Sequence, residues 1–472
     1  MIPEPVLQEL SGIVGPRHLK TLPEDLTDYS RDATKLEFMP DAVAFPGNAE
    51  EISQILTLAN REGFPVIPRG AGSGISGGAL PTKGGLVLTM DRFNRILSID
   101  QDNLIVKVES GVITARLQEE VEKVDLFYPP DPASIKISSI GGNVAECAGG
   151  LRAVKYGVTR DYVLGLAVVL PTGKIIQTGV ETAKGVVGYD LTRLIVGSEG
   201  TLAIVTSVTL RLIPKPATKR TMMSFFPDVL SAVEAVSKII RNRIVPSVLE
   251  FMDKLSIDCV REETGLPIPR ETGALLLIEV DGHEDLVFKE AKSIEDICTR
   301  SGATHFQTSS GEEEAERLWE ARRNASPSMM RLRPNKVSED VVVPRTRLPE
   351  LVLFLSQLGK KYGIPIPAFG HAGDGNLHVN IMFDENVREE KENVHAVVKD
   401  LFRKVIKMGG TISGEHGIGI TKAPYLDMEI PGPSLDLMAR IKKAFDPNNI
   451  LNPGKIFPQI HSPSGLHPSG SK

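Results

Sequence analysis

The segment from Gly70 to Gly78 most constrains the fold, because it holds five glycines within nine residues and directly follows an apolar strand pattern at 65–69. Such glycine density disfavours both helix and strand and leaves successive backbone N–H groups open to a ligand. A concave run of N–H groups binds phosphate. No helical pattern follows Gly78, so the segment matches neither G-x-G-x-x-G nor G-x-x-x-x-G-K-S/T. The sequence predicts a phosphate-binding loop that disfavours NAD and ATP; the alternative is an ordinary surface loop.

Alternating helix and strand patterns surround this loop. Asn48 is expected to cap a helix that follows a strand at 41–46. The remaining elements of this part are strands at 85–89 and 104–109, a helix at 114–124, and a hairpin between 164–170 and 174–178. From about residue 219 strands and amphipathic helices alternate, at 222–226, 230–240, 248–252, 274–280 and 284–300. We expect an α+β protein whose second domain has an antiparallel sheet.

Length, charge and cysteine content narrow the class of protein. At 472 residues the chain exceeds a single hydrophobic core, and its net charge of -6 argues against a nucleic-acid surface. No run reaches the ~18 apolar residues of a membrane span, and no secretory signal is visible. Three scattered cysteines, Cys147, Cys259 and Cys298, indicate a reducing compartment. We expect a cytoplasmic protein that binds small molecules, without nucleic acid or a membrane span.

Two further glycine clusters follow the first in order. Gly141 and Gly142 precede Gly149 and Gly150, and Gly197 lies close to Gly200. With the first loop, from about residue 41 to 215, they resemble the FAD-binding domain of the vanillyl-alcohol oxidase family, also called the p-cresol methylhydroxylase type; the tail at 452–455 fits the same family. The resemblance implies a two-part FAD-binding domain at 1–218, a substrate and metal domain at 219–425, and a C-terminal segment at 426–460 that returns to the flavin. The last stretch, 461–472, is expected to be disordered.

Carried over position by position, the resemblance implies a cofactor site. The pyrophosphate would be wrapped by Pro68, Arg69, Gly70, Ala71, Gly72, Ser73 and Gly74. The flavin would be lined by Pro130, Asp131, Ser134, Gly141, Gly142, Asn143, Gly150, Tyr156 and Gly157, with Glu199, Gly200 and Ile204 towards the adenosine and Asn452 added from the tail. Some members attach FAD through a histidine in the first loop. This chain has Ser73 near that place, so the attachment is expected to be non-covalent.

Histidines and glutamate gather in two glycine-bracketed segments, 370–378 and 413–419. An offset of seven would put His371 and His378 on opposite faces of one strand, so binding one ion requires a turn between them, which Asp374-Gly375-Asn376 supplies. Two imidazoles and a carboxylate with open positions describe a catalytic site for one divalent ion, zinc, manganese or iron. The alternative is that these histidines are ordinary polar residues in turns.

Glu415 and His416 are adjacent, and in extended backbone their side chains point apart, so only one is well placed as a ligand. We assign Glu415 to the metal and His416 to proton transfer. Asp374 could replace Glu415 as a ligand, but we expect its side chain to bond to the backbone of the turn instead. The two segments resemble the group of FAD-linked D-lactate dehydrogenases, glycolate oxidases and D-2-hydroxyglutarate dehydrogenases. In that group the residues matching His371, His378 and Glu415 hold a divalent metal, and the one matching His416 is the base.

This resemblance implies that the chain oxidises a small D-2-hydroxy acid, with the hydride passing to flavin N5 and His416 taking the hydroxyl proton. Arg322 is expected on a helix, where its guanidinium would bind the substrate carboxylate. Hydroxyglutarate-specific members add a hydroxyl matching Ser326 and a lysine further on. Lys336 lies near that lysine's place, but alignment on 340–344 puts Ser338 there. We therefore rank D-lactate and glycolate above D-2-hydroxyglutarate.

Two other functions compete with this interpretation. A metal-dependent hydrolase would also use histidines and a glutamate around an ion, but it leaves the three glycine clusters unexplained. The second alternative is a non-catalytic flavoprotein subunit, and the presence of a candidate base, His416, argues against it. Because three scattered cysteines exclude an iron–sulfur cluster with ordinary cysteine ligation, electrons are expected to leave to another protein, such as an iron–sulfur subunit or an electron-transfer flavoprotein, or to a dye-like acceptor or oxygen.

Overall fold

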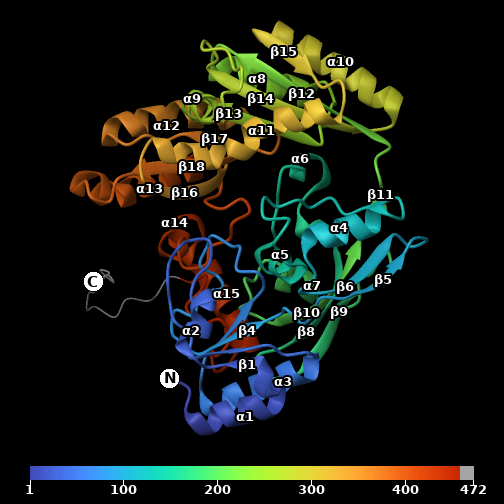
Figure 1. Ribbon diagram of the computed structural model, residues 1–472, viewed down its shortest axis with the longest axis vertical. Helices are drawn as coiled ribbons and strands as arrows, with labels where there is room; N and C mark the ends of the chain where they lie inside the picture. The colour runs from blue at the N-terminus through green and yellow to red at the C-terminus, as the bar shows by residue number, and fades with distance from the viewer. Residues whose placement is uncertain (458–472) are drawn as a thin grey trace.

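The computed structural model describes residues 1–457 and shows two packed units (Figure 1). The first half of the chain builds the lower unit in that view and the second half builds the upper one, while the last helices, in red, return from the upper unit to the lower one. The expected disordered stretch at 461–472 lies outside the described residues, as do residues 458–460.

A four-stranded mixed sheet forms one half of the first unit. Its strand order is β1 (Leu19–Lys20), β2 (Ala42–Ala44), β4 (Leu86–Thr89) and β3 (Val66–Arg69). Helices α1 (Glu4–Val14) and α3 (Ala49–Glu62) pack on it, and α2 (Pro23–Leu26) precedes β2. The predicted cap is present, since Asn48 accepts a hydrogen bond from the Glu51 N–H at 2.8 Å. The glycine-rich loop leaves this sheet at the end of β3.

A five-stranded antiparallel sheet forms the other half. Its order is β5 (Ile96–Asp100), β6 (Ile105–Glu109), β10 (Ile204–Arg211), β8 (Val163–Val169) and β9 (Ile175–Gly179). The predicted hairpin is confirmed as β8 and β9. Its helices are α4 (Thr114–Glu122), α5 (Ile140–Glu146), α6 (Ala153–Tyr156) and α7 (Leu191–Ile195), and β7 (Leu126–Phe127) pairs with β11 (Ile213–Pro214).

The second unit is built on a seven-stranded sheet in which all neighbouring strands are antiparallel, as predicted. The order is β15 (His305–Thr308), β12 (Thr218–Phe226), β14 (Ala274–Gly282), β13 (Val248–Asp253), β17 (Ala368–His371), β18 (Asn376–Phe383) and β16 (Asn335–Val342). One face packs against α8 (Val229–Arg241), α10 (Glu284–Arg300), α12 (Leu348–Tyr362) and α13 (Arg388–Lys407), and the other against α9 (Lys254–Thr264) and α11 (Glu312–Ser328).

Strand alternation separates the apolar core of this sheet from its polar residues. Val341 and Leu377 belong to the larger core under α8, α10, α12 and α13. Because successive side chains of a strand point to opposite faces, their neighbours Asp340 and His378 point to the other face, as does Glu250. The strand that carries Glu250, β13, contacts α6 of the first unit. The part of this face that carries Glu250 therefore lies near the boundary between the units.

The C-terminal segment runs back to the first unit through α14 (Leu426–Glu429) and α15 (Gly432–Phe445). The Lys442 ammonium donates to the Thr201 carbonyl at 2.8 Å, and Leu451 forms a parallel bridge with Val66 of β3. These contacts place the end of the described chain beside the strand that leads into the glycine-rich loop.

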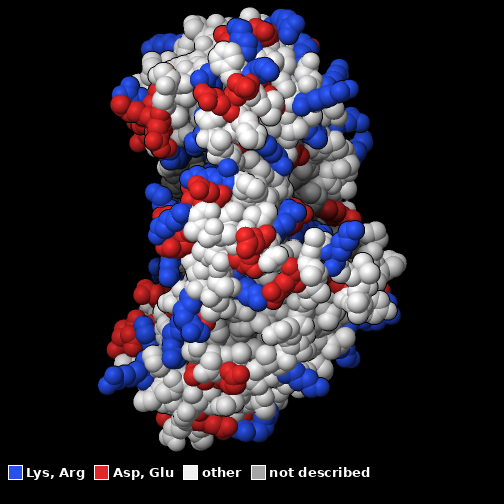
Figure 2. Space-filling view, turned by 90° about the vertical axis from the view of Figure 1, so that its right-hand side faces the viewer, with Lys and Arg blue, Asp and Glu red and all other residues white. Residues whose placement is uncertain are grey.

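The described part of the chain has no helix long and apolar enough to cross a membrane. Lys and Arg side chains are interspersed with Asp and Glu over the face shown in Figure 2. No large patch of one sign stands out on that face.

Candidate active site

A cavity in the first unit collects most of the residues predicted to hold the cofactor. Its walls come from the loop after β3, the start of α5, and the turn between α7 and β10. The predicted residues that line it are Pro68, Arg69, Gly70, Ala71, Gly72, Ser73, Gly74, Ser134, Gly141, Gly142, Asn143, Glu199, Gly200 and Ile204. Glu415 and His416 from the other end of the chain line it too. The cavity therefore brings the glycine clusters and the predicted base together.

The walls of this cavity fit a phosphate-bearing cofactor. Gly72 has φ +66°, and a Cβ atom there would collide with the Arg69 guanidinium, so the loop requires glycine at this position. Two lining residues, Arg69 and Glu146, each keep a buried polar atom without a hydrogen-bond partner among the described residues. Buried polar groups normally have partners. These free atoms and the open backbone suit a polar ligand.

Six predicted cofactor residues do not line the cavity: Pro130, Asp131, Gly150, Tyr156, Gly157 and Asn452. The Tyr156 hydroxyl donates to Asp281 of the second unit at 2.8 Å. Asp131 accepts a bond from the Arg152 N–H at 3.1 Å. Asn452 donates to the carbonyls of Gly78 and Glu199, at 2.9 and 2.8 Å. In the structure Asn452 thus supports the cavity wall, and Tyr156 contributes to the contact between the units.

His371 and His378 lie on the two strands of one hairpin. His371 ends β17 and His378 is on β18, opposite Phe369. The turn is where the sequence predicted it, with Asp374 accepting a bond from the Asn376 N–H at 3.1 Å. Gly375 has φ +91° and packs on the Val343 carbonyl, which leaves no room for a side chain. The turn brings the two rings to a centroid distance of 5.2 Å.

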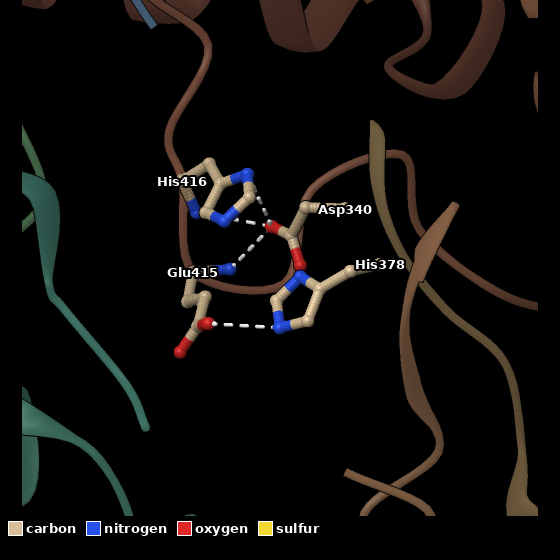
Figure 3. A group of neighbouring side chains, drawn as sticks. All are labelled: Asp340, His378, Glu415 and His416. Carbon is tan, nitrogen blue, oxygen red and sulfur yellow. Dashed lines mark hydrogen bonds and ion pairs between the residues drawn. The ribbon is translucent and has the colours of Figure 1, made fainter. Parts of the chain in front are cut away.

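Glu415 and His416 are on a loop that wraps around Asp340 (Figure 3). One oxygen of the Asp340 carboxylate accepts bonds from the N–H groups of Gly414, Glu415 and His416, at 2.8, 2.8 and 3.0 Å. The segment is thus bent, which corrects the expectation from an extended backbone that the two side chains point apart. Both line the cavity. The His416 ring stacks on His378 at 5.3 Å.

One group of possible metal ligands, with all its ligand atoms within 4.8 Å of one another, contains Asp340, His378, Glu415 and His416 but not His371. Glu415 Oε1 lies 3.5 Å from His371 Nε2 and 3.6 Å from His378 Nε2. Asp340 is near enough to rival Glu415 as a ligand, but its carboxylate is already bonded to three N–H groups and to the Asn376 amide. The geometry suits Asp340 to holding the loop.

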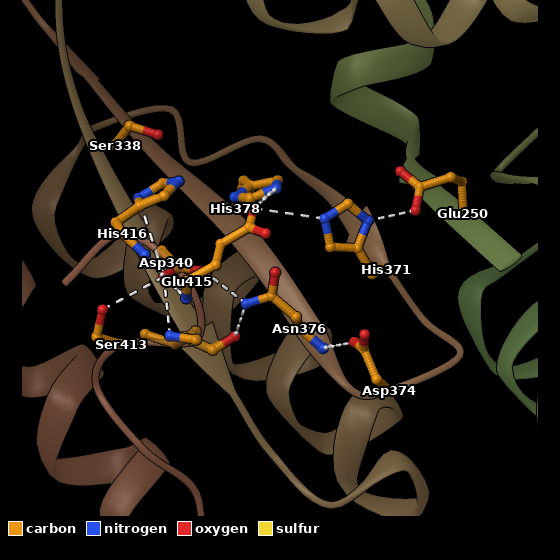
Figure 4. A network of polar contacts seen from close by, with 12 residues as sticks. Glu250, Ser338, Asp340, His371, Asp374, Asn376, His378, Ser413, Glu415 and His416 are labelled. Carbon is orange, nitrogen blue, oxygen red and sulfur yellow. Dashed lines mark hydrogen bonds and ion pairs between the residues drawn. The ribbon is translucent and has the colours of Figure 1, made fainter. Parts of the chain in front are cut away.

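Glu250 lies on the side of His371 that faces away from His378 (Figure 4). Its side chain is fully buried, with one oxygen bonded to His371 Nδ1 and the other to Arg322 Nε. His371 Nε2 is buried and without a partner among the described residues. A carboxylate on one ring nitrogen with the other nitrogen free is the arrangement of metal-binding histidines. His371, His378 and Glu415 therefore fit a divalent ion.

Comparison with known proteins gives the family. A model of the FAD-binding domain matches residues 40–179, and a model described as the C-terminal domain of FAD-linked oxidases matches residues 215–456. This chain belongs to the FAD-linked oxidases. It is 47% identical over 458 residues to the glycolate oxidase subunit GlcD of Bacillus subtilis (strain 168), with 97% of each chain covered. It is 34% identical over 454 residues to the D-lactate dehydrogenase of Anaerostipes hadrus, covering 94% of this chain and 95% of that one.

Solved structures confirm the predicted fold. p-Cresol methylhydroxylase with substrate bound superposes with a TM-score of 0.79 at 18% identity, covering 96% of both chains. 4-Ethylphenol oxidase from Gulosibacter chungangensis gives 0.76 at 20% identity, covering 96% of this chain and 97% of that one. As an FAD-linked oxidase the protein binds FAD, and the metal-dependent hydrolase is no longer a competing function.

The site of this FAD-linked oxidase is electrostatically polarised. Burial opposes a charge on His371, but Glu250 and Glu415 outweigh it and hold the pKa of His371 well above its ordinary value. Burial and the neighbouring His371 lower the pKa of His378 to about 3. Burial also lowers the pKa of His416. His416 is therefore neutral at physiological pH and able to accept a proton.

Arg322 lies on α11, as predicted, and its guanidinium stacks over the Phe369 ring at 4.5 Å. Its Nε is bonded to Glu250, and no terminal nitrogen of Arg322 has a hydrogen bond to the residues described. One turn along the helix, Ser326 accepts a bond from the Lys336 ammonium at 2.7 Å. Lys336, rather than Ser338, thus reaches the hydroxyl on α11. Ser338 instead donates to Asn380 at 3.1 Å.

The sequence interpretation gave no role to Glu250, and it used Asp340 only to align a lysine. Both are buried carboxylates on strands, Glu250 in Val248–Asp253 and Asp340 in Asn335–Val342. A charged residue is almost never fully buried unless it is paired. A carboxylate between two apolar neighbours, as in Leu249-Glu250-Phe251, is a signal that would have found Glu250, whereas Asp340 follows Glu339 in a strand that also holds Asn335 and Lys336 and carries no such signal.

Proposed function

We propose that this protein oxidises a small D-2-hydroxy acid, D-lactate or glycolate, to the 2-oxo acid. The proposal assigns the base to His416, a divalent ion to His371, His378 and Glu415, and the substrate carboxylate to Arg322. It is supported by the names of the relatives, a glycolate oxidase subunit and a D-lactate dehydrogenase. The observation that carries it is that His416 and Glu415 line the cavity of the FAD-binding domain, next to the histidine hairpin.

The roles follow from the chemistry of alcohol oxidation. FAD supplies the hydride acceptor when it is bound. A divalent ion at the three ligands would lower the pKa of the substrate hydroxyl and hold the adjacent carboxylate. His416 is neutral, is held by its own N–H on Asp340, and stacks on His378, so it is placed to take the hydroxyl proton. Glu250 fixes both His371 and Arg322.

FAD is proposed to be bound without a covalent link. Ser73 lines the cavity near the place where covalent members carry a histidine, and the first loop, Gly70 to Gly78, contains no histidine. Acid precipitation of the purified protein should therefore release all of the flavin into the supernatant. Yellow colour that stays with the denatured chain would contradict the proposal.

A second candidate substrate is D-2-hydroxyglutarate. The contact between Lys336 and Ser326 favours it, because these groups lie one helical turn beyond Arg322 on α11 and would suit a distal carboxylate. The pKa of Lys336 is lowered by burial and by Lys35, so an anion there would relieve the repulsion between the two ammonium groups. We keep D-lactate and glycolate first, because those activities are in the relatives' names.

Specificity constants with an artificial electron acceptor decide between these substrates. D-Lactate or glycolate should be preferred, and a Lys336→Met variant should leave their turnover unchanged. A preference for D-2-hydroxyglutarate by tenfold or more, lost in Lys336→Met, would reverse the ranking. Failure of all 2-hydroxy acids, with FAD and metal both present, would overturn the proposed function.

The physiological acceptor is proposed to be a separate protein, an iron–sulfur subunit or an electron-transfer flavoprotein. Two observations support this proposal. The relative from Bacillus subtilis is named as a subunit, and all three cysteines of this chain are buried and far apart in the sequence. Reduction of an added acceptor protein by substrate-reduced enzyme, faster than reduction of oxygen, is the expected result.

A further inference from the structure

Glu146 is a buried acid in the wall of the FAD cavity that the proposed reaction does not use. It is the last residue of α5 and lines the cavity. Its Oε1 atom lies under Gly78, and its Oε2 atom under Gly417, where a Cβ atom would have no room. Glu146 thus lies between the glycine-rich loop and the loop of His416.

The Oε2 atom of Glu146 is buried and has no hydrogen-bond partner among the described residues. Nearby, the Ser76 hydroxyl is also buried without a partner. A buried polar atom left unpaired costs about 1–3 kcal/mol, so an unpaired atom in a cavity wall indicates a partner that enters with the ligand. The ligand of this cavity is FAD, because the chain belongs to the FAD-linked oxidases.

The charge state of Glu146 decides whether its side chain can donate a hydrogen bond to FAD or only accept one. Its near neighbour Glu199 accepts bonds from the N–H groups of Ile418 and Gly419, at 2.8 and 2.6 Å, and faces Lys422 and Lys455. Glu146 lacks such support and faces Glu199 and Asp32. Burial, then Glu199 and Asp32, raise the pKa of Glu146 well above its ordinary value, and the nearby Ser76 hydroxyl opposes this rise. Burial raises the pKa of Glu199 as well, but that of Glu146 is raised well above its ordinary value, so a proton shared by this buried pair resides mainly on Glu146.

We propose that Glu146 binds FAD by donating a hydrogen bond from a neutral carboxyl group to an oxygen atom of the cofactor. A neutral acid is the form compatible with a cofactor that carries a diphosphate, because a second buried carboxylate would repel it. The cofactor oxygen would also give the Glu146 carboxyl group a hydrogen-bond partner, which its Oε2 atom lacks among the described residues. Its position makes it a cofactor-binding residue next to the catalytic loop.

Three substitutions separate donation from packing and charge. Glu146→Gln keeps an N–H donor and should bind FAD within about twofold of the wild type. Glu146→Leu keeps the volume but removes the donor, and should weaken FAD binding about three- to tenfold, the value of one net hydrogen bond. Glu122→Gln on α4, whose partner is Lys215 on the surface, is the control and should change nothing. The readout is the FAD dissociation constant of the reconstituted apoprotein, from flavin fluorescence.

The pH dependence tests the neutral state. A group with a raised pKa keeps its proton at neutral pH and loses it only as the pH rises through the raised value. FAD binding to the wild type should therefore weaken from neutral to alkaline pH, and Glu146→Gln should lose this extra dependence. This comparison still holds if Glu146→Leu fails to fold. The proposal would be overturned if Glu146→Leu bound FAD as tightly as the wild type, or if Glu146→Gln bound it as weakly as Glu146→Leu. A pH profile of Glu146→Gln identical to that of the wild type would overturn it too.

Discussion

The two halves of the active site are built in different ways. The cavity proposed to hold the cofactor is walled by glycine-containing segments, the loop of Gly70 to Gly74, the start of α5 and the turn at Gly200. The half proposed to be catalytic is made of side chains on antiparallel strands, His371 and His378, with a loop held by Asp340. Backbone recognition tolerates no side chain at the contact, whereas the proposed chemistry depends on side chains, two of which, His371 and Arg322, are held by the buried Glu250. Substitutions in the first half should therefore weaken FAD binding, and substitutions in the second should impair metal binding or turnover.

The sharpest test removes a proposed metal ligand from the catalytic half. His378→Ala should lose the ion and turnover of substrate while keeping full FAD, because the hairpin lies outside the residues that line the cavity. Elemental analysis and the flavin spectrum of the same sample measure both. His395→Ala, an exposed residue of α13, is the matched control. Loss of FAD together with the metal in His378→Ala would contradict the view that the two halves bind their ligands independently.

Removing the proposed base is expected to have the next largest effect. His416→Ala should keep FAD and metal but slow flavin reduction by substrate by roughly 10²–10⁴-fold, the contribution of a general base. The wild-type imidazole is neutral because burial lowers its pKa, so no proton has to leave it first. Stopped-flow measurement of flavin bleaching tests this, and a near-normal rate would remove His416 from the mechanism.

A buried partner should matter almost as much as a ligand. Glu250→Gln cannot offer a carboxylate to His371 and Arg322 at once, so metal affinity should fall about 10–100-fold and the substrate KM should rise. Glu279→Gln, a buried glutamate on the neighbouring strand β14 that accepts from Thr221, controls for general damage to the sheet. The same metal loss in Glu279→Gln would show that Glu250 acts only through stability.

The smallest effect is expected in the cavity. Gly72→Ala should weaken FAD binding, because φ +66° costs a non-glycine residue about 1–2 kcal/mol and the new methyl group displaces Arg69. Metal content should not change. Gly12→Ala in α1, where a Cβ atom meets nothing, is the control. Wild-type FAD affinity in Gly72→Ala would indicate that the loop is not a fixed backbone cradle.

The local features of the site could be predicted from the sequence. The turn at Asp374 to Asn376 was required by the spacing of His371 and His378, and the structure has it there. The glycine-rich loop was readable because its signal lies within nine residues. In both cases the residues that interact are close together in the chain.

Features of the site that depend on residues far apart in the sequence could not be predicted from local sequence patterns. The bent backbone of Glu415 and His416 follows from their N–H groups binding Asp340, 75 and 76 residues earlier. Glu250 lies 121 residues from His371. Propensity and spacing carry no information on such partners, so the sequence pointed to the proposed metal ligands but to neither the loop geometry nor its anchors.

The catalytic loop is anchored from both units at once. Asp340 of the second unit holds the N–H groups of Gly414 to His416, and Glu199 of the first unit holds those of Ile418 and Gly419. Neither unit alone fixes this loop. The proposed base would therefore reach its position only after both units have folded and packed together, and a half-folded chain would lack the geometry proposed for the reaction.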